Sequence, residues 1–145
     1  MSNEKLELRH LAPYLPFGLE VNCLMGRFVC SGLYNRHGWD YIIFDGLTKS
    51  DDLLVNVKPL LRPLSDLTKE ITHNGETFVP IEWLKENKNV ELLNGVYPDG
   101  TKRVWNDRTM TTNIRFFEYC IVEKLIEWHF DIFGLIPKNL ALPKE

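Results

Sequence analysis

Residues 113–136 read NIRFFEYCIVEKLIEWHFDIFGLI, and this stretch has a strong helical periodicity. At about 100° per residue of an α-helix, one narrow stripe carries Phe117, Ile121, Leu125, Trp128 and Ile132. Further residues widen this arc to more than half of the circumference, namely Val122, Ile126, His129, Phe130 and Phe133. The pattern predicts a long C-terminal helix that other elements cover nearly all round, and we expect the core to be built on it.

The overall composition is that of one soluble globular domain over residues 1–145, with 44% hydrophobic and 26% charged residues. A formal charge of −3 argues against the general basic footprint of nucleic-acid-binding proteins, but it allows a local basic patch. The first residues are polar, and no apolar run approaches the roughly 18 residues of a membrane span. We therefore expect a cytoplasmic protein with reduced thiols and no membrane association.

The N-terminal half favours strands after one helical turn in residues 8–18. Alternating apolar residues predict strands at 19–25, 28–34, 39–44 and 53–57. Because the connections between them are short, these strands should form an antiparallel meander.

The middle of the chain favours short pieces. Ser65 can begin a brief helix, Asn74-Gly75 predicts a tight hairpin turn, and Pro80 suits the first position of another helix. A second hairpin should join 92–97 with 102–105. The predicted class is α+β: an N-terminal antiparallel meander packed against a long C-terminal helix, with short helices and hairpins between them.

Two of the three cysteines lie on the first predicted hairpin. Cys23 and Cys30 flank Gly26-Arg27, which is suited to a two-residue turn. This turn would place Cys23 directly opposite Cys30 on the core face. In the cytosol we expect both thiols to be reduced and buried, although opposed cysteines can in principle oxidise.

Motifs for metal, cofactor or nucleophilic chemistry are absent from the sequence. The four histidines and three cysteines show none of the paired spacings of a metal site. No nucleophile motif occurs in the sequence. A phosphate-binding glycine loop is also absent, because the glycines are scattered singly among turns. We predict no catalytic residue, no metal and no cofactor.

One carboxylate, Glu118, falls inside the apolar arc of the predicted helix, where an unpaired charge is costly. It would form a salt bridge with Arg115, or with an arginine such as Arg62 from another element. The alternative is a functional acid in a cleft, which would make the protein an enzyme with a buried carboxylate.

An acidic row on the polar face of the same helix is formed by Glu123, Glu127 and Asp131, at a spacing of four residues. Like charges at this spacing repel slightly. The row is either a solvated face or a partner-binding strip for a basic host or phage protein.

Cations and aromatic residues alternate in the predicted hairpin over residues 97–108. They are Tyr97, Lys102, Arg103, Trp105 and Arg108. This combination makes a nucleic-acid contact plausible here, but we favour an ordinary exposed hairpin with a half-buried tryptophan, which explains the same residues.

Four blocks of the chain, 11–19, 58–67, 74–81 and 127–136, together carry a family resemblance. They begin with LAPYLPFGL and end with EWHFDIFGLI. In this order they resemble a group of small uncharacterised proteins encoded by phages and prophages of gut Bacteroides-type bacteria. The resemblance implies a mobile-element setting and a bacterial cytosol, and it implies no catalytic residues. Segments 35–52 and 85–112 lie largely between the blocks.

These observations favour a phage or prophage accessory protein that binds another protein and has no enzymatic activity. The first alternative is a nucleic-acid-binding module that uses the hairpin 97–108. The second is an enzyme that uses Glu118.

Overall fold

The computed structural model describes residues 5–23, 26–45, 50–88, 92–96, 102–106, 110 and 117–144. The chain divides into two compact units: unit 1 is Met1–Leu61 with Phe133–Glu145, and unit 2 is Arg62–Ile132. Helices and strands both occur, so the predicted α+β class is confirmed. Each helix in the described part of the chain is too short or too polar to cross a lipid bilayer. One domain over residues 1–145 stays a prediction.

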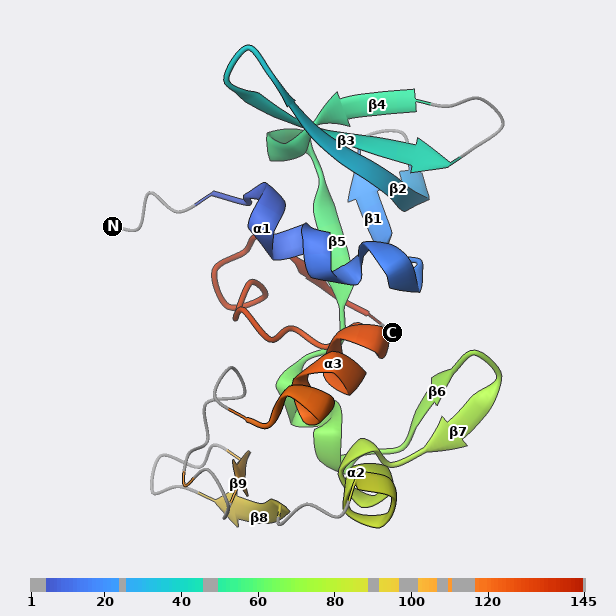
Figure 1. The fold of residues 1–145 in the computed structure, drawn as a ribbon, viewed down its shortest axis with the longest axis vertical. Helices are drawn as coiled ribbons and strands as arrows, with labels where there is room; N and C mark the ends of the chain where they lie inside the picture. The colour runs from blue at the N-terminus through green and yellow to red at the C-terminus, as the bar shows by residue number, and fades with distance from the viewer. Residues whose placement is uncertain are drawn as a thin grey trace. The chain divides into compact units, whose positions relative to one another are not determined.

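Unit 1 begins with α1 (Leu8–Leu11) and η1 (Ala12–Phe17), which end at Gly18 in the left-handed region with φ +68°. This confirms the predicted helical turn. Its described strands form one sheet in the order β10-β5-β1-β2-β3-β4 (Figure 1). They are β1 (Glu20–Cys23), β2 (Gly26–Arg36), β3 (Trp39–Asp45), β4 (Ser50–Leu53), β5 (Lys58–Leu61) and β10 (Leu142–Pro143).

Strands β1 to β4 are consecutive antiparallel neighbours, and β10 pairs with β5 in parallel. The predicted strand at 53–57 is wrong. β4 ends at Leu53, and a 3-10 turn, η2 (Leu54–Asn56), follows it. The N–H of Val57 donates to the carbonyl of Leu54 at 3.2 Å, and both residues are buried. These two apolar residues therefore reach the core across a turn.

The register of β1 and β2 differs from the prediction. Cys23 pairs with Gly26 and Val21 pairs with Phe28, so the connection lies at 24–25 and Cys23 does not face Cys30. In this register Phe28 stacks on Phe44, with ring centroids 5.4 Å apart. The shift is by an even number of residues, which keeps each side chain on its predicted face. Both cysteines are accordingly buried, and both are free thiols.

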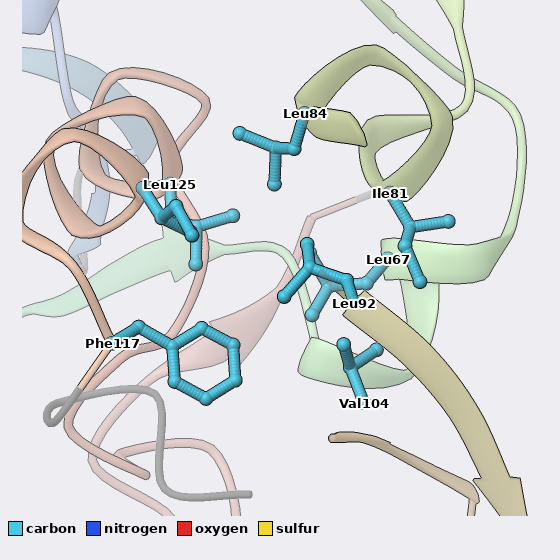
Figure 2. Close-up of a pocket in the computed structure, with 8 residues that line it drawn as sticks. Leu67, Ile81, Leu84, Leu92, Val104, Phe117 and Leu125 are labelled. Atoms are coloured by element: carbon cyan, nitrogen blue, oxygen red, sulfur yellow. The ribbon is translucent and has the colours of Figure 1, made fainter. Parts of the chain in front are cut away.

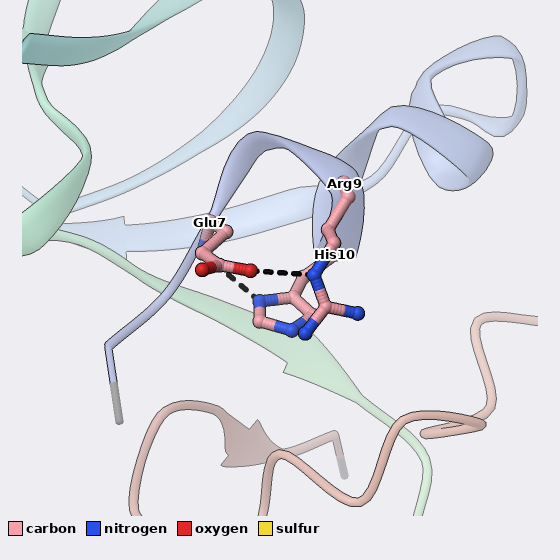
Figure 3. Close-up of polar contacts among 3 residues, drawn as sticks. All are labelled: Glu7, Arg9 and His10. Carbon is pink, nitrogen blue, oxygen red and sulfur yellow. Dashed lines mark hydrogen bonds and ion pairs between the residues drawn. The ribbon is translucent and has the colours of Figure 1, made fainter. Parts of the chain in front are cut away.

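The start of α1 is held by polar contacts (Figure 3). The N–H of Glu7 donates to Nδ1 of His10 at 2.9 Å, and Nε of Arg9 donates to the Glu7 carboxylate at 2.5 Å. This hydrogen bond from Arg9 lowers the pKa of Glu7. The buried His10 ring meets Phe133 edge-on at 5.5 Å, which ties the first turn of unit 1 to its C-terminal segment.

Unit 2 consists of short elements. They are η3 (Leu64–Thr68), β6 (Ile71–His73), β7 (Glu76–Phe78), α2 (Pro80–Lys88), β8 (Leu92–Val96), β9 (Lys102–Asn106) and α3 (Tyr119–Glu127). Both predicted hairpins are confirmed, because β6 pairs with β7 and β8 pairs with β9. Asn74 and Gly75 have φ of 51° and 82°, as the predicted tight turn requires.

The predicted helix over residues 113–136 is wrong in extent. α3 starts after Glu118, whose backbone is extended, and ends at Glu127; residues 113–116 lie outside the described residues. His129 then takes a left-handed conformation with φ +64°. The chain leaves the helix there because the carbonyl of His129 and the N–H of Asp131 pair with the backbone of Arg62, at 2.7 and 3.0 Å.

Side chains from five elements meet inside unit 2 (Figure 2). The enclosed volume is about 10 Å³, close to one water position, and its lining is entirely apolar. A buried water needs two to four polar partners, so this space is packed core and no ligand site. The lining residues are Leu67, Ile81, Leu84, Leu92, Val104, Phe117, Ile121 and Leu125.

The predicted core stripe is confirmed as buried, although three of its members, Phe117, Trp128 and Ile132, lie outside α3. The stripe is Phe117, Ile121, Leu125, Trp128 and Ile132.

Candidate protein-binding surface

The exposed side of α3 carries Tyr119, Cys120 and Glu123, whereas Ile121 and Leu125 face the interior of unit 2. Tyr119 is 79% exposed, which is unusual for a side chain with this much apolar area. Residues four apart are neighbours on a helix, so Tyr119, Glu123 and Glu127 follow one another along this side.

Three aromatic rings meet at the C-terminal end of α3, one from β7, one from α2 and one from the residue that follows α3. The Trp128 ring lies 4.9 Å from Phe78 of β7 and 5.1 Å from Trp83 of α2, measured between centroids. Trp128 is buried, whereas Phe78 and Trp83 are half-buried. The aromatic cluster therefore extends from the buried contact between α2 and α3 to the protein surface.

Lys124 connects the aromatic rings to the acidic residues. Its Nζ lies 4.8 Å from the centroid of Trp83 and 5.6 Å from that of Trp128, within the range of cation–π attraction. The same ammonium pairs with Glu127 at 2.5 Å. The charge of Lys124 is thus shared between a carboxylate and two indole rings.

We call this region the α3 surface, and it consists of Trp83, Tyr119, Cys120, Glu123, Lys124 and Glu127. Tryptophan and tyrosine are enriched among the residues that dominate binding energy in protein interfaces, where charged residues form the rim. The α3 surface has this composition. Sequence reasoning missed Trp83, because no local pattern shows that α2 places it beside Lys124.

The predicted acidic row does not exist as one strip. Glu123 is exposed and Glu127 is partly exposed, but Asp131 lies beyond the end of α3 and is only 3% exposed. The row fails because the helix ends four residues before Asp131. Partner binding by Glu123 and Glu127 stays a prediction.

For the residues of the hairpin 97–108 that were predicted to bind nucleic acid, the structure describes at most the backbone. Lys102, Arg103 and Trp105 lie in β9, whereas Tyr97 and Arg108 lie outside the described residues. Nucleic-acid binding by this hairpin stays a prediction.

Glu118 is half-buried at the start of α3. Nδ2 of Asn106, a fully buried residue, donates a hydrogen bond to Oε1 of Glu118. The predicted salt bridge from Arg62 to Glu118 is wrong, and Arg115 lies outside the described residues. This hydrogen bond joins β9 to the start of α3, whereas Oε2 of Glu118 is buried without a hydrogen-bond partner in the described part of the chain.

Arg62 has a role that sequence reasoning missed. Its Nε donates to the carbonyl of Trp128 at 3.0 Å, and its Nη2 donates to the carbonyl of Thr72 at 2.9 Å. Burial lowers the pKa of the guanidinium. One side chain therefore fastens the β6–β7 hairpin to the end of α3.

The four histidines do not gather in one place. His10 is buried and His37 is exposed in unit 1, and in unit 2 the rings of His73 and His129 meet edge-on at 5.2 Å. Within the described residues, His, Cys, Asp and Glu side chains do not gather in groups of three that would suit a metal ion.

Comparison of the chain with protein-family models, with curated proteins and with solved structures gave no match.

Proposed function

We propose that this protein binds another protein through the α3 surface and does not itself catalyse a reaction. The observations that carry the proposal are the half-buried Trp83, which lies against Lys124 of α3, and Tyr119 of the same helix, which is 79% exposed. Aromatic side chains already fixed by their neighbours lose little conformational entropy on binding, so they serve as anchors.

The charges of the α3 surface indicate the chemistry of the partner. Glu123 and Glu127 supply two negative charges, and Lys124 offsets one of them. The partner should therefore present apolar side chains to Tyr119 and to Trp83, with lysine or arginine around them. Its basic rim would orient the encounter, while the aromatic anchors would supply most of the affinity.

The biological setting is part of the proposal. We infer a phage or prophage accessory protein in the bacterial cytosol, with a host or phage protein as partner. The free thiols of Cys23, Cys30 and Cys120 agree with a reducing compartment.

Affinity capture from a lysate of a Bacteroides-type host, followed by titration of the purified captured protein, tests the proposal. Tyr119→Ala and Glu123→Lys baits should bind that protein at least about tenfold more weakly than wild type. Glu76→Lys makes the same charge change at an exposed site on the β6–β7 hairpin, and it should bind as wild type does. A captured protein that binds all four baits equally would exclude the α3 surface.

The enzyme alternative has a separate test. If the purified protein turned over a substrate and Glu118→Gln abolished that turnover, the binding proposal would be replaced.

A further inference from the structure

A second group of aromatic residues lies in unit 1, on the β2–β3 hairpin, where Tyr34 and Tyr41 are half-buried and Trp39 is exposed. The register pairs Tyr34 with Tyr41 and Arg36 with Trp39. Because paired residues point to the same side of a sheet and alternate residues share a face, these four lie on one face. Leu33 pairs with Ile42 on the opposite face, where Ile42 is buried. We call the first face the outer face.

The aromatic rings of the outer face are arranged for stacking. Tyr34 and Tyr41 are nearly parallel, with centroids 4.9 Å apart and an angle of 7° between the rings. Trp39 lies two residues before Tyr41 on the same face of β3 and is 58% exposed. A stacked tyrosine pair stabilises a hairpin by itself, but an exposed tryptophan at its end adds nothing to the core.

Cationic side chains lie next to Trp39. Arg36 is directly across from it and is exposed. A depression of about 40 Å³ beside Trp39 is lined by Lys5, Leu6 and Leu53, among others. Asp40 also lines this depression, and its carboxylate accepts a hydrogen bond of 2.8 Å from Asn35.

We propose that the outer face binds single-stranded nucleic acid, independently of the protein-binding α3 surface. A base stacks on Trp39, and the adjoining phosphates contact Arg36 and Lys5. Every base has a π face, so this mode tolerates sequence and requires unpaired bases. The formal charge of −3 supplies no general attraction, so affinity rests on stacking and a few phosphate contacts. Binding should be in the micromolar range at low salt and weaken as salt rises.

Fluorescence anisotropy with labelled 15-nucleotide oligo-dT and oligo-U, and with a matched DNA duplex, tests this proposal. Trp39→Ala should weaken binding of the single strands about tenfold, and Trp39→Phe should retain most of it. Arg36→Gln should reduce the slope of log K against log salt by about 0.7 for one lost phosphate contact. Tyr119→Ala, which removes an exposed aromatic residue from unit 2, is the matched control and should bind as wild type does.

Three results would overturn the proposal. The first is no binding of either single strand at low salt by a protein with a wild-type circular dichroism spectrum. The second is equal binding by wild type and Trp39→Ala, or equal binding of duplex and single strands. The third is binding that survives Trp39→Ala but is lost in the Lys102→Gln/Arg103→Gln double variant, which would assign the site to the β8–β9 hairpin.

Discussion

The two units satisfy their buried polar groups in different ways. In unit 1, backbone groups pair from strand to strand across the β10-β5-β1-β2-β3-β4 sheet. In unit 2, the buried Arg62 donates to carbonyls at the ends of two elements, Trp128 and Thr72. A sheet can be specified by alternating apolar and polar residues and by its turns. In a unit made of short elements, stability depends more on single side chains that hold these elements together. Unit 2 should therefore be the more sensitive of the two to one well-chosen substitution.

The largest effect is expected in the interior of unit 2. Leu125 is 0% exposed and lines the apolar core, so Leu125→Ala should lower the free energy of unfolding by about 2–5 kcal/mol. Urea unfolding followed by tryptophan fluorescence and circular dichroism measures the loss. Glu123→Ala, an exposed position on the same helix, is the control. An unchanged midpoint for Leu125→Ala would refute the assignment of the core.

Removal of the guanidinium tests the contrast between the units directly. Arg62→Met leaves the carbonyls of Trp128 and Thr72 without their donor, which should cost about 2–4 kcal/mol. Arg62→Lys should recover only part of this loss, because a single ammonium does not reproduce the two-pronged donor. If urea unfolding showed Arg62→Met to be as stable as wild type, the contrast between the units would be wrong.

A smaller effect is expected from the backbone of unit 1. Gly18 has φ +68°, and a Cβ at this position would meet no atom within 4 Å. Gly18→Ala should therefore cost only the left-handed backbone strain, about 1–2 kcal/mol, and Gly18→Asn should cost less. Thermal denaturation of the two variants gives the comparison. Equal losses of stability for alanine and asparagine would show that the left-handed backbone conformation of Gly18 is not the cause of the loss.

The smallest effect concerns the exposed pair at the start of α1. Arg9 lowers the pKa of Glu7 in the folded protein, so the pair stabilises the fold above the ordinary carboxyl pKa. This contribution is lost as the pH falls through the lowered pKa. Arg9→Gln should raise the Glu7 pKa toward its ordinary value, as measured by NMR titration of the carboxyl carbon. A Glu7 titration that is identical in both proteins would exclude the pair.

Short-range patterns predicted much of the local structure. Asn74-Gly75 marks the β6–β7 turn, and Pro80 begins α2. Gly18 ends the first helical turn for the same kind of reason. Each of these signals depends on the backbone preferences of one or two residues, so it is present in the sequence itself.

Long-range partners could not be predicted in the same way. The helical periodicity continues in the sequence after Glu127, yet the helix ends there, and the backbone of His129 and Asp131 pairs with that of the distant Arg62. Because the helix ends at Glu127, Asp131 is also separated from Glu123 and Glu127. Trp83 became a site residue only because α2 packs beside Lys124. The sequence therefore predicted the acidic residues of the candidate surface, Glu123 and Glu127, whereas its aromatic residue Trp83 was identified only from the structure.

The most direct test of protein binding uses Cys120, the exposed free thiol on the α3 surface. A benzophenone attached to Cys120 should, on irradiation in host lysate, form a discrete adduct with one protein. Cys23 and Cys30 are buried, and a Cys120→Ser protein controls for labelling elsewhere. The adduct should disappear in Tyr119→Ala and Glu123→Lys and persist in Glu76→Lys. An adduct of equal yield in all of these variants, or no adduct with the wild-type protein, would contradict binding through the α3 surface.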